Sequence, residues 1–212
     1  MTYGKLASVT LAAVLVSAMV PSHARSAKVE FTPVIAHITP LKSQVADIDA
    51  PLVIRQSDAT AYGARVGIWL APRIGVEGSV LVGSSSIQLI GGTLLNLDAT
   101  TMQLDLRARI RLNDPASDNG FDAIVGVGMN DLNDGLSDAG ESIGLESPST
   151  VEFVIGLGAT ISVSDHIRLR FDAEDHIHDS NYEIDETAFG SPVETNSQND
   201  LVFALGVVIP LW

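Results

Sequence analysis

The 212-residue chain has no cysteine, and aromatic side chains make up only 5% of it. Without cysteine the protein has no disulfide framework and no thiol chemistry. The low aromatic content is unusual for a membrane barrel, because such barrels carry aromatic girdles. A chain without disulfides must be held together in another way, and a closed sheet provides one because it leaves no strand edge unpaired.

Positive charge and long apolar segments are also scarce. Lys and Arg number 12 against 26 Asp and Glu, so the net charge is −14, which argues against a nucleic-acid partner. The longest apolar run, residues 6–20, is shorter than the ~20 residues of a spanning helix. No later segment is longer, so a membrane role would have to use strands.

The N-terminal apolar run has the features of a secretory signal peptide. Lys5 precedes the run, Pro21 ends it, and Ser22 and Ala24 are small residues at the −3 and −1 positions of a cleavage site. We predict that residues 1–24 are removed and that residues 25–212 form one domain. Lys5 is the only charged residue removed, so the net charge of −14 becomes −15.

Strict alternation of apolar and polar residues runs from Met102 to Leu112. Even positions are apolar, and odd positions carry Gln, Asp or Arg. A period of two places these sets on opposite faces of a strand. Eight segments read as strands on this pattern and on their flanking turn residues: 28–39, 61–71, 73–84, 100–112, 121–130, 150–163, 167–178 and 200–212.

The connections between these segments alternate in length. About twenty residues follow the first segment, only Pro72 follows the second, and about fifteen follow the third. The alternation continues to the last connection, as in membrane barrels with long external loops and short periplasmic turns. The sequence therefore predicts an all-β fold, an eight-stranded antiparallel up-and-down transmembrane β-barrel.

The polar face of the segments mixes glycine with charge. An eight-stranded barrel has an interior just wide enough for side chains, so small residues must sit beside long ones. On a soluble exterior, mid-strand glycine would cost ~0.5–1 kcal/mol without such a reason. We predict that the apolar face meets lipid and that an internal ion-pair network plugs the lumen, formed by Arg65, Glu77, Asp105, Arg107, Arg109, Arg111, Asp122, Glu152, Arg168, Arg170, Asp172 and Glu174.

The last segment ends in an aromatic residue, Trp212, which resembles the assembly signal of bacterial outer-membrane barrels. With the leader, the eight segments and the alternating connections, the chain resembles the small outer-membrane β-barrel proteins of the OmpA-transmembrane, OmpX and OmpW type. The resemblance implies residence in a Gram-negative outer membrane, with outer-membrane lipid and the barrel-assembly machinery as partners. We expect a monomer without a cofactor.

Two local motifs suggest other chemistry. The run His178-x-Ser180-Asn181 is similar to the motif of lipid A 3-O-deacylases, which implies Ser180 as nucleophile, His178 as base and Glu183 or Glu186 as the orienting acid. His178 and Ser180 share the parity of the inward charges, however, whereas a lipid-cleaving site should face the bilayer. We therefore favour a polar strand end without catalysis.

The second motif is an acidic stretch one residue short of the start of an EF-hand loop. Weak calcium binding there would use Asp131, Asn133, Asp134 and Asp138. We favour a solvated acidic loop without a metal.

These observations together predict a non-enzymatic barrel with a structural or surface-interaction role and acidic external loops. A small porin-like channel, a lipid A-modifying hydrolase and a soluble secreted barrel that binds an apolar ligand stay open as alternatives.

Overall fold

The computed structural model describes residues 28–42, 45–46, 53–91, 93–134, 145–146, 149–164, 166–179, 183–184, 194–195 and 197–211. The eight predicted strands are all present, within a few residues of their predicted bounds at most ends. They are β1 (Lys28–Pro40), β4 (Ala59–Ala71), β5 (Ile74–Gly91), β6 (Thr93–Arg111), β7 (Gly120–Asp134), β9 (Thr150–Ser164), β10 (Ile167–His178) and β13 (Gln198–Pro210).

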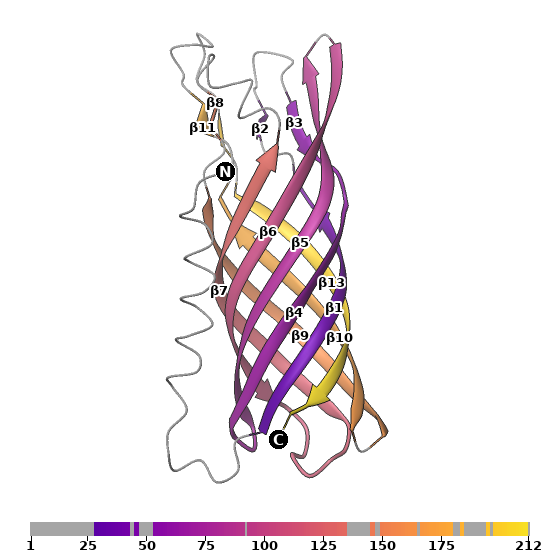
Figure 1. The fold of residues 1–212 in the computed structure, drawn as a ribbon. Coiled ribbons are helices and arrows are strands. Elements are labelled where there is room, and N and C mark those ends of the chain that lie inside the picture. Colours follow the sequence, from indigo (N-terminus) through magenta and orange to yellow (C-terminus); the bar gives the residue numbers. More distant parts are fainter. Residues whose placement is uncertain are drawn as a thin grey trace, which may run out of the picture.

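The eight long strands close into an antiparallel barrel (Figure 1). Closure is made by β1, in which Ile35 lies opposite Tyr62 of β4 on one side and opposite Leu205 of β13 on the other. Because the ring is complete, the long strands have no free edge along the barrel wall. No helix in the described part of the chain is long and apolar enough to cross a membrane.

Short strands lie at one end of the barrel. Three of them, β2 (Val45–Ala46), β3 (Val53–Gln56) and β12 (Glu194–Thr195), extend the main sheet beside β5. The other two, β8 (Leu145–Glu146) and β11 (Glu183–Ile184), pair with each other. All five belong to the predicted long connections, so this end differs from the end with the short turns.

The connection between β5 and β6 corrects one sequence prediction. We expected a loop of about fifteen residues after residue 84, but the two strands remain paired up to Gly91 and Thr93. The hairpin projects from the top of the barrel in Figure 1. The Ser- and Gly-rich sequence lacks clear alternation, whereas the ladder is made by backbone groups that need none.

The outer surface of the barrel is apolar, which confirms the predicted faces. Leu106 and Phe153 expose 54% and 61% of their surface, although both are large hydrophobic side chains. Toward the end with the long connections, the outward positions become polar: His37, Thr60, Ser84, Thr100, Asp131, Asp175 and Asn199. This change marks the upper border of an apolar band, and the β5–β6 hairpin continues beyond it.

The interior is not charged throughout. One wall, formed by β1, β4, β5 and β13, carries a buried apolar cluster of Val34, Ala36, Ile38, Ala59, Ala61, Leu81, Val202 and Ala204. Elsewhere glycine makes room for charge, because a Cβ on Gly158 would overlap Oδ1 of the facing Asp172. On the wall that carries the apolar cluster, Glu30, Arg65 and Glu77 lie nearer the short turns than the cluster does.

Candidate functional site

The lumen near the short turns holds a first group of ion pairs around Glu30. This β1 carboxylate accepts from Arg168 of β10 at 2.8 Å and from Arg109 of β6 at 3.2 Å. Arg109 also donates to Asp122 at 2.7 Å, and Arg111 donates to the other oxygen of Asp122 at 2.6 Å. These contacts join β1, β6, β7 and β10 across the barrel.

A second group lies deeper in the lumen. Arg170 of β10 pairs with both carboxylate oxygens of Glu77 on β5, with 3.1 Å for the longer contact, and donates to Asp172 at 2.9 Å. Asp172 also pairs with Arg65 of β4. In the ring of eight strands, β5 and β10 stand four places apart, so the contact between Arg170 and Glu77 spans opposite walls.

The third group is centred on Arg107 of β6. Its two terminal nitrogens donate to Glu174 and Asp105, each at 2.6 Å. The side chains of these three residues are fully buried. Each carboxylate accepts one charge-assisted hydrogen bond from the guanidinium, so Arg107 bridges Asp105 and Glu174.

Two histidines lie above these pairs, toward the long connections. His176 contacts Glu152 through Nδ1 and Glu174 through Nε2, both at 3.2 Å. His178 contacts Asp200 through Nε2 at 3.2 Å, and its Nδ1 lies 2.7 Å from the backbone oxygen of Asp179. Both imidazoles are buried inside the barrel.

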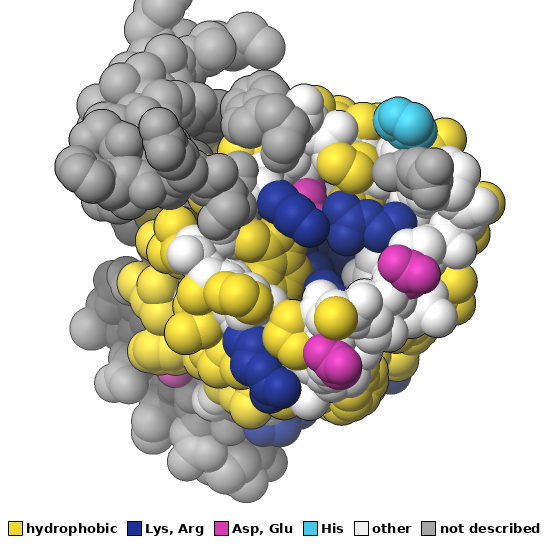
Figure 2. Space-filling view, turned by 90° about the horizontal axis from the view of Figure 1, so that it is seen from below, with side chains coloured by type: hydrophobic (Ala, Val, Ile, Leu, Met, Phe, Trp, Pro, Cys, Tyr) yellow, Lys and Arg dark blue, Asp and Glu magenta, His cyan; other side chains and the backbone are white. Residues whose placement is uncertain are grey.

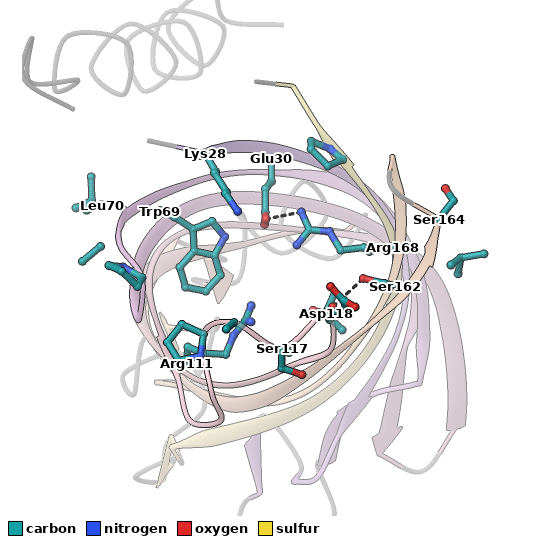
Figure 3. Close-up of a pocket in the computed structure, with 18 residues that line it drawn as sticks. Lys28, Glu30, Trp69, Leu70, Arg111, Ser117, Asp118, Ser162, Ser164 and Arg168 are labelled. Atoms are coloured by element: carbon teal, nitrogen blue, oxygen red, sulfur yellow. Dashed lines mark hydrogen bonds and ion pairs between the residues drawn. The ribbon is translucent and has the colours of Figure 1, made fainter. Parts of the chain in front are cut away.

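A cavity of about 1000 Å³ opens at the end with the short turns. Figure 2 shows this end with Lys and Arg side chains gathered around a hollow. In Figure 3, Trp69 and Lys28 point into the cavity, and the pair between Glu30 and Arg168 lies at its wall. Arg109 and Arg111 stack within 4.8 Å and 4.9 Å of the Trp69 ring, so charged side chains lie where the cavity meets the network.

Comparison with protein families agrees with this architecture. The family model of the outer membrane protein beta-barrel domain matches residues 8–207. The chain belongs to this outer membrane β-barrel family. The protein is therefore placed in the outer membrane of a Gram-negative bacterium. In barrels of this kind the short turns lie on the periplasmic side and the long connections outside.

A solved structure shares the fold of this outer membrane barrel. The chain is similar to the outer membrane protein OprG from Pseudomonas aeruginosa, with a TM-score of 0.63 and 14% identity over 87% of this chain and 95% of that one. Outer membrane protein W of E. coli has a TM-score of 0.49 and 18% identity over 86% and 97% of the two chains. None of the curated proteins compared with the chain matches it. At these identities the likeness concerns the fold alone.

The structure of this outer membrane barrel places all twelve residues named for the network on the inner face, each in at least one ion pair or imidazole contact. Sequence reasoning missed Glu30, His176 and Asp200 as members. His176 could have been predicted from the sequence, because on β10 it lies on the same face as Arg170 and Asp172. Glu30 and Asp200 lie near the ends of strands for which no inner face was assigned.

The residues of the deacylase-like motif do not form a described site. His178 faces the lumen and not the lipid, as its parity indicated. Glu183 lies in β11, and its backbone pairs with Glu146. Ser180 lies outside the described residues, as do residues 1–24 and the predicted assembly signal Trp212.

The calcium motif is corrected in part. Asp131, Asn133 and Asp134 belong to β7, and their partners on β6 are Met102, Thr100 and Ala99. An EF-hand loop turns its ligands toward one point, whereas an extended strand separates them. Asp138 lies outside the described residues.

Proposed function

We propose that this barrel is a closed, non-enzymatic envelope protein with a structural or surface-interaction role, and that the arginine–carboxylate network plugs its lumen. The observation that carries the proposal is that successive ion pairs join distant walls. Glu30 and Arg168 meet near the periplasmic mouth, and further pairs between β5 or β6 and β10 follow above them.

Burial of these groups supports a plug. Side chains of Arg65, Arg107 and Arg170 are at most 1% exposed, although each is long and charged. In a water-filled pore, lumen side chains stay hydrated, so charges that span the bore and exclude water favour a closed barrel. The periplasmic cavity would then be a vestibule that ends at the network.

Acidity of the external connections supports a role at the cell surface. The chain has a net charge of −14, and its acidic residues cluster in 113–149 and 172–200, which include two of the long connections. Functional residues are often on loops carried by a rigid scaffold. A surface of one sign attracts partners of the opposite sign over about a Debye length, ~8 Å at physiological salt.

Solute flux tests the closed lumen. Purified barrel is reconstituted into vesicles, and swelling in an isotonic sugar or amino-acid solution is compared with vesicles that contain an equal amount of an open porin. We expect flux at the level of empty vesicles. Flux that grows with the amount of folded barrel would instead establish the porin-like channel.

Complementation separates the two roles. A deletion strain is tested for outer-membrane leakage and then supplied with the wild-type chain or with a Glu141→Gln/Glu186→Gln variant in the long connections. A structural role predicts equal rescue by both, whereas a surface-interaction role predicts weaker rescue by the neutralised variant at equal folded amount. Failure of the wild-type chain to change any envelope property would contradict both.

A further inference from the structure

Two buried carboxylates of the lumen face the same glycine. Asp105 of β6 and Glu152 of β9 are the register partners of Gly128 on β7, one on each side. A Cβ added to Gly128 would lie 3.0 Å from Oε1 of Glu152 and still closer to Oδ1 of Asp105. The glycine therefore leaves a small space between two carboxylate oxygens.

The two oxygens beside Gly128 accept no hydrogen bond from an N–H or hydroxyl group of the described residues. Their carboxylates are almost completely buried, with 5% of Asp105 and 0% of Glu152 exposed. The other oxygen of each is engaged, by Arg107 at 2.6 Å and by His176 at 3.2 Å. Two charged oxygens facing each other at this depth are destabilising, so either a shared proton or a bound cation is needed between them.

The imidazole of His176 adds a third possible metal ligand to the two carboxylates. One possible ligand atom each from Asp105, Glu152 and His176 lies within 4.8 Å of the other two, and all three residues are buried. Two carboxylates and an imidazole are ligands that divalent transition metals accept, zinc among them. Glu174 contacts the far nitrogen of His176, as the outer partner of a metal-bound imidazole does.

The charge of the lumen is consistent with such an ion. Among the described residues, the lumen holds the arginines Arg65, Arg107, Arg109, Arg111, Arg168 and Arg170 and the carboxylates Glu30, Glu77, Asp105, Asp122, Glu152, Asp172, Glu174 and Asp200. The carboxylates outnumber the arginines by eight to six, so the lumen attracts further positive charge, which the two buried imidazoles or a bound cation would supply.

The surroundings define the side from which a cation would enter. On the periplasmic side lie Arg65, Arg107 and Arg170, whose charge repels cations. On the external side lie Gln103, whose amide nitrogen and oxygen have no partner among the described residues, and Asp200, which has one such oxygen. We propose that Asp105, Glu152 and His176 form a site for one divalent transition-metal ion, entered from the cell surface.

Metal titration tests the site. Untagged, folded barrel in detergent is stripped with a chelator and titrated with Zn²⁺ by calorimetry, and with Co²⁺ by its visible absorption. We expect one ion per barrel and a higher unfolding temperature when Zn²⁺ is in excess. Asp105→Asn and Glu152→Gln should each weaken binding ~10-fold or more, by analogy with losses at outer-shell partners.

Two further variants make the result specific. Asp122→Asn removes a buried carboxylate of the network outside the site, so its affinity should equal that of the wild type. Gly128→Ala retains the three ligands but fills the space between them, and it should lose binding. If Gly128→Ala does not fold, the near-isosteric variants Asp105→Asn and Glu152→Gln decide whether the site binds the ion.

Folding of every variant is checked by the boiling-dependent shift on a gel. A wild-type barrel that binds no ion, or Asp105→Asn and Glu152→Gln variants that bind as tightly as wild type, would overturn the proposal. Neither result depends on whether the lumen conducts, so the closed-lumen proposal stands or fails separately.

Discussion

Arg107 and Glu174 meet across the lumen with 2.6 Å between Nη1 and Oε1, although they belong to strands three places apart in the ring. Both side chains are fully buried, and each has a second partner of opposite charge, Asp105 for Arg107 and Arg65 for Glu174. Neither could stay ionised alone at this depth without a large desolvation cost. The pair therefore ties two walls of the barrel through a network that holds it in place.

Removal of Arg107 should destabilise the barrel strongly. We expect Arg107→Met to lower the free energy of unfolding by about 3–5 kcal/mol, because Asp105 and Glu174 lose a shared buried cation. Urea titration of the folded protein in vesicles, followed by the boiling-dependent gel shift, measures the change. The control is Arg73→Gln in the exposed turn between β4 and β5, for which we expect a change within ~0.5 kcal/mol. Equal stability of the two variants would mean that the network contributes little.

The lipid-facing surface gives a second prediction. Leu106→Arg places a charge near the middle of the apolar band and should cost roughly 2–4 kcal/mol of unfolding free energy. Leu112→Arg lies just beyond the periplasmic end of β6, where the same substitution should cost about 0–1 kcal/mol. The same urea titration compares the two. A near-neutral Leu106→Arg in a folded, inserted sample would mean that residue 106 does not meet mid-bilayer lipid.

The orientation of the barrel predicts which connections can be labelled from outside. A single cysteine at Gly92, between β5 and β6, should react with a membrane-impermeant maleimide on intact cells. A cysteine at Ser117, in the turn between β6 and β7, should react only after the outer membrane is permeabilised. The wild-type chain has no cysteine and gives no background. Labelling of Ser117→Cys alone on intact cells would reverse the assigned orientation.

The sequence was enough to locate the strands and their faces, because alternation and turn residues are local. In β6 the pattern runs without interruption from Met102 to Arg111, and the structure buries Arg107 while exposing Leu106. The β5–β6 hairpin was not predicted, because its outer part has no clear alternation. Its pairing depends on the partner strand beside it, which local patterns do not record.

The sequence also could not predict which side chains pair with each other inside the lumen. Parity shows that Arg170 and Glu77 both face inward, but their contact depends on the tilt and stagger of strands four places apart. The apolar wall near Val202 and Leu81 was not predicted, since apolar residues on both faces of a strand hide which face is inside. Glu30 was not predicted as a member of the network for a related reason, because no inner face was assigned to the first strand.

Single-channel recording in a planar bilayer tests the closed lumen most directly. We compare wild type with Glu77→Ala/Arg170→Ala, which removes a pair that spans opposite walls, and with Arg111→Ala/Asp122→Ala, which removes a pair nearer the periplasmic mouth. The account predicts no steady conductance for wild type, discrete openings for the first variant and far fewer for the second. Steady wild-type openings that neither substitution changes would contradict it.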